Sequence, residues 1–290
     1  MRVLVTGAAG MVGRAVCEHC ETRDDTVFPY DHRALDIANA ESVVREVTAI
    51  QPDAIINCAA WTDVDGCEKD KQHAQAANAD GPENLANASR IVNAVFVTIS
   101  TDYVFDGEKG GFYTQDDEPN PTSVYGLSKL AGEQRAQNAY PAAIIVRSGF
   151  IFGPGGRNFL STVVEKLRNP PVRAIADAWG TPTYAIHLAE RLRELAALNL
   201  PGIYHVVNSG EGAAYDEFAR VVVQELGKDQ SQVQSVLSST LKRSAPRPRN
   251  SRLKCLISEE RGLLPLPPWD DAVRDFLSRT ASAPAAGLRL

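Results

Sequence analysis

Short apolar runs alternate with longer amphipathic stretches along the first half of the chain. Aliphatic and β-branched residues cluster in five runs, at Val3–Thr6, Thr26–Tyr30, Ala54–Ala60, Ala94–Ser100 and Ala142–Arg147. Stretches with a helical period separate them, at Met11–Glu21, Ala40–Ile50, Lys71–Ser89 and Val124–Asn138. Ile144-Ile145-Val146 is apolar at successive positions, as in a strand covered on both faces. The alternation predicts an α/β fold with a Rossmann-like, doubly wound parallel sheet.

The pattern changes after Gly149, where proline- and glycine-rich breaks become frequent. Two further strands and two helices are predicted, at Val172–Ala176, Ile203–Asn208, Ile186–Leu198 and Tyr215–Leu226. We expect a dinucleotide-binding domain of residues 1–149 with an interleaved segment at about 184–208. Residues of about 150–183 and 209–279 form a smaller C-terminal α/β substrate lobe. The tail at 280–290 is rich in Ala, Ser and Pro and is predicted to be disordered.

A glycine-rich loop lies between the first predicted strand and the first predicted helix. Gly7, Gly10 and Gly13 have the spacing GxxGxxG. These glycines allow a sharp turn, the approach of a pyrophosphate to the backbone, and close packing of the helix on the sheet. The free N–H groups of the helix N-terminus then face the phosphates. The loop therefore predicts a nicotinamide dinucleotide as cofactor.

The end of the second strand bears on the choice between NADH and NADPH. Asp31 stands where an acidic residue hydrogen-bonds the adenine ribose, and Arg33 stands where a cation meets a 2′-phosphate. The two interpretations stay open at this point.

Three polar residues follow in the order expected for carbonyl reduction. Thr101 closes the fourth strand, at the sheet edge where doubly wound folds bind ligands. Tyr125 and Lys129 lie four residues apart on one face of the next helix. We expect Lys129 to lower the pKa of the Tyr125 phenol, which makes the phenol a better general acid. The predicted roles are substrate positioning for Thr101 and catalysis for all three.

Charge and cysteine content narrow the class of protein. The net charge of -6 over 290 residues disfavours nucleic acid and anionic membranes as partners. No membrane span or targeting segment is predicted, and the cytosol is the expected location. Cys17 and Cys20 form an isolated CxxC inside a helix, without a second pair for a metal, and no metal site is predicted.

Longer strings resemble the extended short-chain dehydrogenases, and within them the dTDP-4-dehydrorhamnose reductase family. The resemblance runs from Val3 to about Phe276. Its most specific strings are Ser100-Thr101-Asp102-Tyr103-Val104-Phe105-Asp106-Gly107 and Tyr125-Gly126-Leu127-Ser128-Lys129-Leu130-Ala131-Gly132-Glu133. The resemblance also includes Asp177-Ala178-Trp179-Gly180-Thr181-Pro182-Thr183 and Arg247-Pro248-Arg249-Asn250-Ser251-Arg252-Leu253.

The resemblance implies an oxidoreductase that reduces the C4 ketone of a nucleotide-linked 4-keto-6-deoxyhexose with NADPH or NADH, giving dTDP-L-rhamnose. Tyr125 would protonate the oxygen, and a homodimer is a common state of the family. The implied sugar-binding residues are Thr101, Asp102, Val104, Phe150 and Asn158. The implied cofactor-binding residues, besides the glycines, Tyr125 and Lys129, are Met11, Val12, Asp31, Arg33, Asp36, Ile37, Ala59, Ala60 and Trp61.

Departures from the family pattern keep other functions open. Phe150 stands where the family usually has Trp, Phe152 where it has Tyr, and Lys254 where Asp is common. A reductase or epimerase for another nucleotide sugar is one alternative. A second is a non-catalytic, cofactor-binding protein similar to the regulatory β-subunit of methionine adenosyltransferase, which the Arg247-Pro248-Arg249-Asn250 string also resembles.

Overall fold

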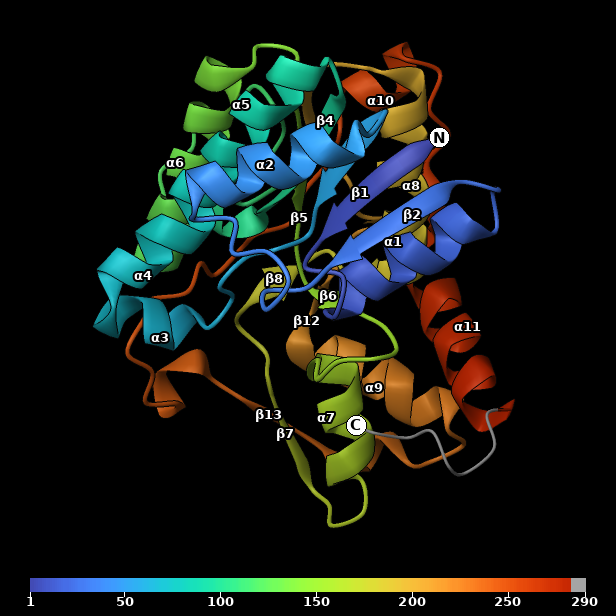
Figure 1. Ribbon diagram of the computed structural model, residues 1–290. Coiled ribbons are helices and arrows are strands. Elements are labelled where there is room, and N and C mark those ends of the chain that lie inside the picture. Colours follow the sequence, from blue (N-terminus) through green and yellow to red (C-terminus); the bar gives the residue numbers. More distant parts are fainter. Residues whose placement is uncertain (283–290) are drawn as a thin grey trace.

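A six-stranded parallel sheet forms the centre of the computed structural model, which describes residues 1–282 (Figure 1). The spatial order of its strands is β10-β5-β4-β3-β1-β2. The strands are β1 (Arg2–Thr6), β2 (Thr26–Tyr30), β3 (Ala54–Asn57), β4 (Val95–Thr101), β5 (Ile144–Ser148) and β10 (Gly202–His205). Strand order reverses at β1, since β2 lies on one side of it and all later strands lie on the other. Ligands bind at the carboxyl edge beside such a reversal.

Helices cover both faces of the sheet, as the apolar runs predict. One face carries α1 (Met11–Glu21) and α8 (Ala185–Leu198), and the other carries α2 (Ala40–Ile50), α5 (Gly81–Val92) and α6 (Val124–Ala139). Successive strand residues enter opposite cores: Val3 and Val5 pack with α1 and α8, whereas Leu4 packs with α2 and α5. The doubly wound α/β fold is confirmed.

A second layer of structure lies below the carboxyl edge of the sheet in Figure 1. Its helices are α7 (Phe159–Lys166), α9 (Tyr215–Glu225) and α11 (Trp269–Ser282). Its paired strands are β7 (Val172–Ile175) with β13 (Val233–Val236), β6 (Ile151–Phe152) with β9 (Thr183–Tyr184), β8 (Trp179–Gly180) with β12 (Ala213–Ala214), and β11 (Asn208–Ser209) with β14 (Leu266–Pro268). A separate core around Phe152, Phe218 and Phe276 holds these elements together.

The chain passes between the two regions more than once. After β9 it returns to the sheet, where α8 packs on α1 and β10 pairs in parallel with β5. It then leaves through α9, comes back to the sheet at the short helix α10 (Ile257–Glu260), whose Ile257 packs against the sheet core, and leaves again through α11. Within residues 1–282, no helix is long and apolar enough to cross a membrane.

Three predicted elements need correction. The third strand ends at Asn57, not at Ala60, because the chain turns there toward the glycine loop. The predicted helix at 71–89 is divided into α4 (Lys71–Gln75), a π-helical turn (Ala76–Asp80) and α5. Pro82 in the first turn of α5 has no N–H to continue the ladder of i to i−4 hydrogen bonds.

The third correction concerns the predicted tail. Helix α11 continues to Ser282, so the prediction of disorder from residue 280 is wrong for its first three positions. The helix persists because Val273 and Phe276 bury an apolar face, and because Arg279 pairs with Asp275 one turn before it. The rest of the predicted tail, 283–290, lies outside the described residues.

Candidate active site

The glycine loop joins β1 to α1 with no room for side chains. Gly7 has a φ of +67°, and a Cβ there would lie 2.6 Å from the backbone nitrogen of Ala59. A Cβ on Gly13 would lie 2.2 Å from the carbonyl oxygen of Gly7. Gly10 begins α1, and no side chain caps the first N–H groups of this helix. The loop therefore presents free backbone donors and the positive end of a helix dipole.

A first cavity, which we call the N-terminal cavity, opens beside this loop with a volume of about 480 Å³. Eight of the residues predicted to bind cofactor line it: Gly7, Gly10, Asp31, Asp36, Ile37, Ala59, Ala60 and Trp61. Arg33 does not line it. Its side chain is exposed, and its backbone N–H donates to Oδ1 of Asp31 at 2.9 Å. His73, which the sequence did not indicate, also lines this cavity and packs edge-on against Trp61.

A second cavity of about 550 Å³, the central cavity, adjoins the first along the glycine loop. Both are lined by Gly10, Cys58, Ala59 and Ala60, so one extended ligand can reach from one to the other. Met11, Val12 and Gly13 line its near end. Thr101, Tyr125 and Lys129 all line it as well, and the three predicted catalytic residues therefore meet in one place.

Local structure fixes the position of Tyr125 and Lys129. Ser123 caps α6, its hydroxyl accepting the N–H of Gly126 at 3.1 Å. A Cβ on Gly126 would lie 2.3 Å from the carbonyl oxygen of Tyr103, so this glycine lets α6 approach the end of β4. Nζ of Lys129 donates to the carbonyl oxygen of Ile99 at 2.7 Å, which holds the amine at the base of the cavity.

Burial dominates the protonation of both residues. It raises the pKa of the Tyr125 phenol well above its ordinary value, and the Thr101 hydroxyl offsets this only in part. The prediction that Lys129 lowers this pKa is wrong, because desolvation of the phenolate outweighs any nearby cation. Burial also lowers the pKa of Lys129 to about 8, with Glu133 acting in the opposite direction. Tyr125 thus keeps its proton at neutral pH.

Asp102 is the buried carboxyl group of the central cavity. Its Oδ1 accepts the hydroxyl of Thr101 at 3.0 Å. A Cβ on Gly149 would lie 2.2 Å from its Cγ, so the carboxyl group packs directly on the Gly149 backbone. Burial raises the pKa of Asp102 to about 6, and hydrogen bonds from Ser251 and Thr101 oppose the rise.

The end of the central cavity far from the glycine loop is aromatic and basic. Phe150 has a φ of +50° and places its ring 4.1 Å from that of Tyr215. Arg247 is held by Asp65 of α3 (Val64–Lys69) through two hydrogen bonds, of 2.8 and 2.7 Å. Arg243 lines the same end with an exposed side chain.

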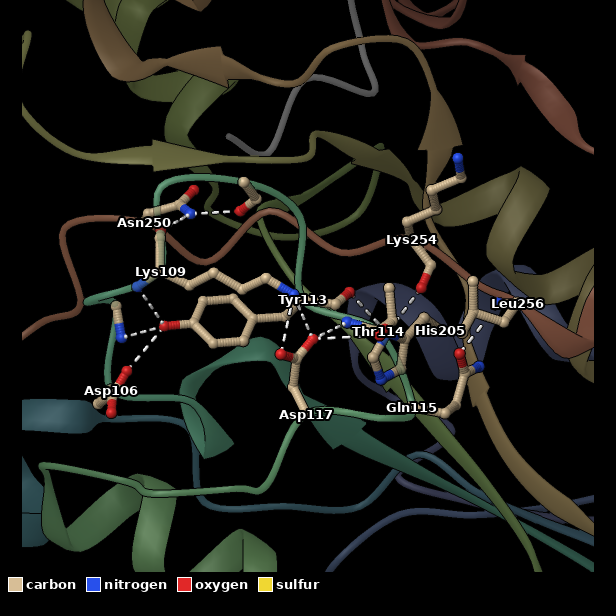
Figure 2. Close-up of polar contacts among 12 residues, drawn as sticks. Asp106, Lys109, Tyr113, Thr114, Gln115, Asp117, His205, Asn250, Lys254 and Leu256 are labelled. Carbon is tan, nitrogen blue, oxygen red and sulfur yellow. Dashed lines mark hydrogen bonds and ion pairs between the residues drawn. The ribbon is translucent and has the colours of Figure 1, made fainter.

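The chain around Ser251 is anchored to the segment that follows β4 (Figure 2). Nδ2 of Asn250 donates to the carbonyl oxygen of Lys109 at 2.6 Å. Nδ1 of His205 in β10 bridges the two stretches, lying 3.2 Å from the carbonyl oxygen of Tyr113, in the same segment, and 3.1 Å from that of Lys254. These contacts bring a C-terminal stretch to the central cavity, where Ser251 lines the wall beside Asp102.

Two residues predicted to bind the sugar are placed elsewhere. Val104 is fully buried in a small core with Phe105 and Leu253, because it follows β4 on the side away from the cavity. Asn158 caps α7, and its Nδ2 donates to the carbonyl oxygen of Gly153 at 2.8 Å. Its amide is therefore committed to the loop, and it is not among the described residues that line the central cavity.

The two cysteines of the CxxC string are weakly acidic thiols. Burial raises the pKa of Cys17 to about 11 and that of Cys20 to about 12, so neither thiol ionises readily. In the described part of the chain, no group of three or more His, Cys, Asp or Glu side chains is arranged to hold a metal ion.

Comparisons with known proteins extend over the whole described chain. The family model of the RmlD substrate binding domain matches residues 1–282. A dTDP-4-dehydrorhamnose reductase of Mycolicibacterium smegmatis is 36% identical over 99% of this chain and 88% of its own length. The crystal structure of such a reductase from Clostridium acetobutylicum has a TM-score of 0.93 at 33% identity, covering 97% of this chain and all of that one. One from Bacillus anthracis, in complex with NADP, has a TM-score of 0.92 at 34% identity, covering 96% and 99%.

Proposed function

Because this chain belongs to the family of the RmlD substrate binding domain, we propose that it is the reductase of dTDP-4-dehydrorhamnose. It reduces the C4 ketone to a hydroxyl group with NADPH or NADH and yields dTDP-L-rhamnose. The observation that carries the proposal is the meeting of Thr101, Tyr125 and Lys129 in a cavity that adjoins a glycine loop. The glycine loop alone, or Tyr125 and Lys129 alone, would support the proposal much less.

The residues present fit a nicotinamide dinucleotide. Gly7 and Gly13 leave a cradle that a Cβ at either position would fill, and α1 offers uncapped N–H groups above it. Asp31 and Trp61 would hold the adenosine part in the N-terminal cavity, and Met11 the pyrophosphate. When bound, the nicotinamide supplies the hydride for the C4 carbon.

The chain's own residues handle the oxygen of the ketone. Tyr125 donates its phenolic proton to that oxygen as the carbonyl becomes an alcohol. The phenol holds its proton at neutral pH, as an acid must when the substrate arrives, although its raised pKa makes it a weaker donor. Lys129, fixed by Ile99, places a positive charge near the phenolate that remains. Thr101 orients the ketone.

The far end of the central cavity suits a nucleoside diphosphate. With the keto carbon beside Tyr125 and the cofactor at the glycine loop, the remaining part of the substrate extends toward Arg243 and Arg247. Arg247 is already neutralised by Asp65, whereas Arg243 has no ion pair in the described part of the chain. We assign Arg243 to the diphosphate and the rings of Phe150 and Tyr215 to the sugar or base.

The direct test is oxidation of NADPH and of NADH by the purified native chain, with dTDP-4-dehydrorhamnose as acceptor and dTDP-L-rhamnose as a control without a ketone. Turnover with the first sugar only is the expected result. A chain that binds the cofactor but leaves this ketone unreduced would overturn the assignment. Other nucleotide-linked ketosugars would then be tried, and a partner would be sought if all of them were inert.

Two further features are proposed with less detail. We place the reaction in the cytosol, in keeping with the five free cysteines of the chain. The homodimer implied by the family stays a prediction, which the molar mass in solution would test.

A further inference from the structure

The single hydrogen of the Thr101 hydroxyl group is engaged before any substrate binds. The oxygen of this group accepts the backbone N–H of Tyr103 at 3.1 Å. Its single hydrogen is donated to Oδ1 of Asp102 at 3.0 Å. Thr101 and Asp102 are each only 5% exposed. As long as Asp102 holds this hydrogen, Thr101 has none to donate to the oxygen of a ketone.

The carboxylate cannot easily give the hydrogen up. Asp102 packs on the Gly149 backbone, which prevents it from turning away. Asp102 receives hydroxyl hydrogen bonds from both Ser251 and Thr101, and a buried carboxylate that loses either donor carries a free-energy cost that water at the surface would otherwise offset. Thr101 will therefore turn toward a ketone only if another donor reaches Asp102 at the same time.

We propose that Asp102 recognises a hydroxyl group on the carbon next to the ketone, and that this contact frees the hydrogen of Thr101 for the keto oxygen. The proposal rests on the proposed function and adds to it a rule for the substrate. In a 2-hydroxyketone the two oxygens lie roughly a hydrogen-bond length apart. That spacing matches the 3.0 Å between Thr101 and Asp102, so both contacts form together. Asp102 is then a specificity residue that acts on the reaction through Thr101.

The protonation of Asp102 offers a second way to free the same hydrogen. Below its pKa of about 6 the carboxyl group carries its own proton, which it can donate to Thr101. The titratable groups that face it are the phenols of Tyr103, Tyr125 and Tyr215. The lysine and arginine side chains that line the same cavity are Lys129, Arg157, Arg243 and Arg247. Phenols stay neutral between pH 5 and 8, and the arginines keep their charge. Lys129, with a pKa of about 8, takes up its proton as pH falls through 8, so Asp102 is the group of this set that titrates around pH 6.

The test compares two nucleotide-linked ketosugars, dTDP-4-dehydrorhamnose and its 3-deoxy counterpart, between pH 5 and 8. We expect the native enzyme at pH 7.5 to favour the 3-hydroxy sugar in kcat/KM by about 10–100-fold. Its preference should shrink as pH falls through 6, because only the 3-deoxy sugar needs Asp102 to be protonated.

The variant Asp102→Asn gives the sharper result. The amide NH2 group donates to Thr101 at every pH, so kcat/KM for the 3-deoxy sugar should rise while that for the 3-hydroxy sugar falls. Misfolding cannot produce such a gain. Thr101→Val should slow both sugars and remove the pH dependence of their ratio. Asp106→Asn serves as the matched control, since Asp106 lies four residues further on, outside the cavity, and should leave the ratio unchanged.

Either of two results would overturn the inference. One is equal kcat/KM of the native enzyme for the two sugars; the other is a fall by the same factor for both in Asp102→Asn. If the native enzyme reduces neither sugar, the proposed function fails, and the rule built on it fails with it. This third result differs visibly from the first two, in which at least the 3-hydroxy sugar is reduced.

Discussion

The two cavities along the glycine loop differ in how the chain builds them. Among the described residues, the N-terminal cavity is lined entirely from the segment between Gly7 and Ala77. The central cavity takes its lining from Gly10 as far as Ser251, and it exists only because β8, α9 and the chain after Arg243 fold over the sheet edge. One is therefore encoded locally, by a strand, a turn and a helix. The other depends on contacts between distant segments.

This difference suits the two cavities to the different tasks proposed for them: one holds the dinucleotide and the other holds the sugar nucleotide. Holding a dinucleotide needs glycines at fixed offsets and a free helix end, which a short stretch supplies. Holding a particular sugar nucleotide needs side chains from several segments, each placed by packing elsewhere. Most of the changes below alter one cavity and leave the other intact, beginning with the largest expected effect.

Tyr125→Phe should abolish chemistry in the central cavity and spare the N-terminal one. Without the phenolic proton, kcat should fall by about 10²–10⁴-fold, because general acid catalysis is lost. The affinity for the cofactor, measured by fluorescence titration, should stay near its native value. Tyr140→Phe is the matched control, as it ends the same helix and lines neither cavity. A variant that retained most of its kcat would remove Tyr125 from the mechanism.

The sequence predicted the locally determined elements of the fold well and the elements that depend on distant contacts poorly. The bounds of α1, β2 and α2 agree with the predicted ranges, because local signals such as the glycine loop and the Asn39 cap set them. The two-residue strands β8 and β12 were not predicted. They owe their conformation to pairing with each other across more than thirty positions, and no local pattern reveals such pairing.

The site was predicted to a similar extent. Thr101, Tyr125 and Lys129 were found because their order along the chain matches a known chemistry, and all three line the central cavity. Arg243 and Tyr215 were missed, since an exposed arginine and a helix-start tyrosine look ordinary until folding brings them to the same wall. Val104 came from the family resemblance; its side chain enters a core, so sugar binding through this residue stays a prediction.

Gly13→Ala should damage the glycine loop, along which the two cavities adjoin. The added Cβ would lie 2.2 Å from the Gly7 carbonyl oxygen and 2.8 Å from Cα of Ala8, both backbone atoms that cannot move cheaply. We expect a loss of about 1–3 kcal/mol in the free energy of unfolding and a clear fall in cofactor affinity. Calorimetry measures the free energy of unfolding, and titration measures the cofactor affinity. Gly110→Ala is the control, because nothing lies within 4 Å of its added Cβ. If the two variants had the same free energy of unfolding and the same cofactor affinity, the close packing around Gly13 would be contradicted.

Arg243→Ala should weaken the far end of the central cavity alone. Because Arg243 is exposed, water screens its charge, and its loss should cost about 1 kcal/mol, or about fivefold in KM for the nucleotide sugar. Values of kcat and of KM for the cofactor should hardly change. Competition by dTDP should weaken in the same proportion, while competition by thymidine should not. Lys242→Ala controls for the loss of a nearby charge, since Lys242 does not line the cavity.

Asp31→Ala should produce the smallest and most selective change, at the adenosine end of the N-terminal cavity. Asp31 and Asp36 are the carboxylates of its lining, and no lysine or arginine is among the described residues there. A 2′-phosphate would therefore meet negative charge, whereas a ribose hydroxyl can donate to Asp31. Removing this carboxylate should raise the ratio of kcat/KM for NADPH over NADH by several-fold, on the order of 1 kcal/mol.

The comparison with Arg33→Ala decides which residue controls the choice of cofactor. Arg33 is exposed and outside the cavity, and only its backbone N–H contacts Asp31. If the cavity as observed governs selectivity, Arg33→Ala leaves the ratio near its native value. A fall in NADPH use in Arg33→Ala larger than the change in Asp31→Ala would mean that the arginine turns in to meet the 2′-phosphate. The cofactor preference of the N-terminal cavity would then depend on a side chain that moves when the cofactor binds.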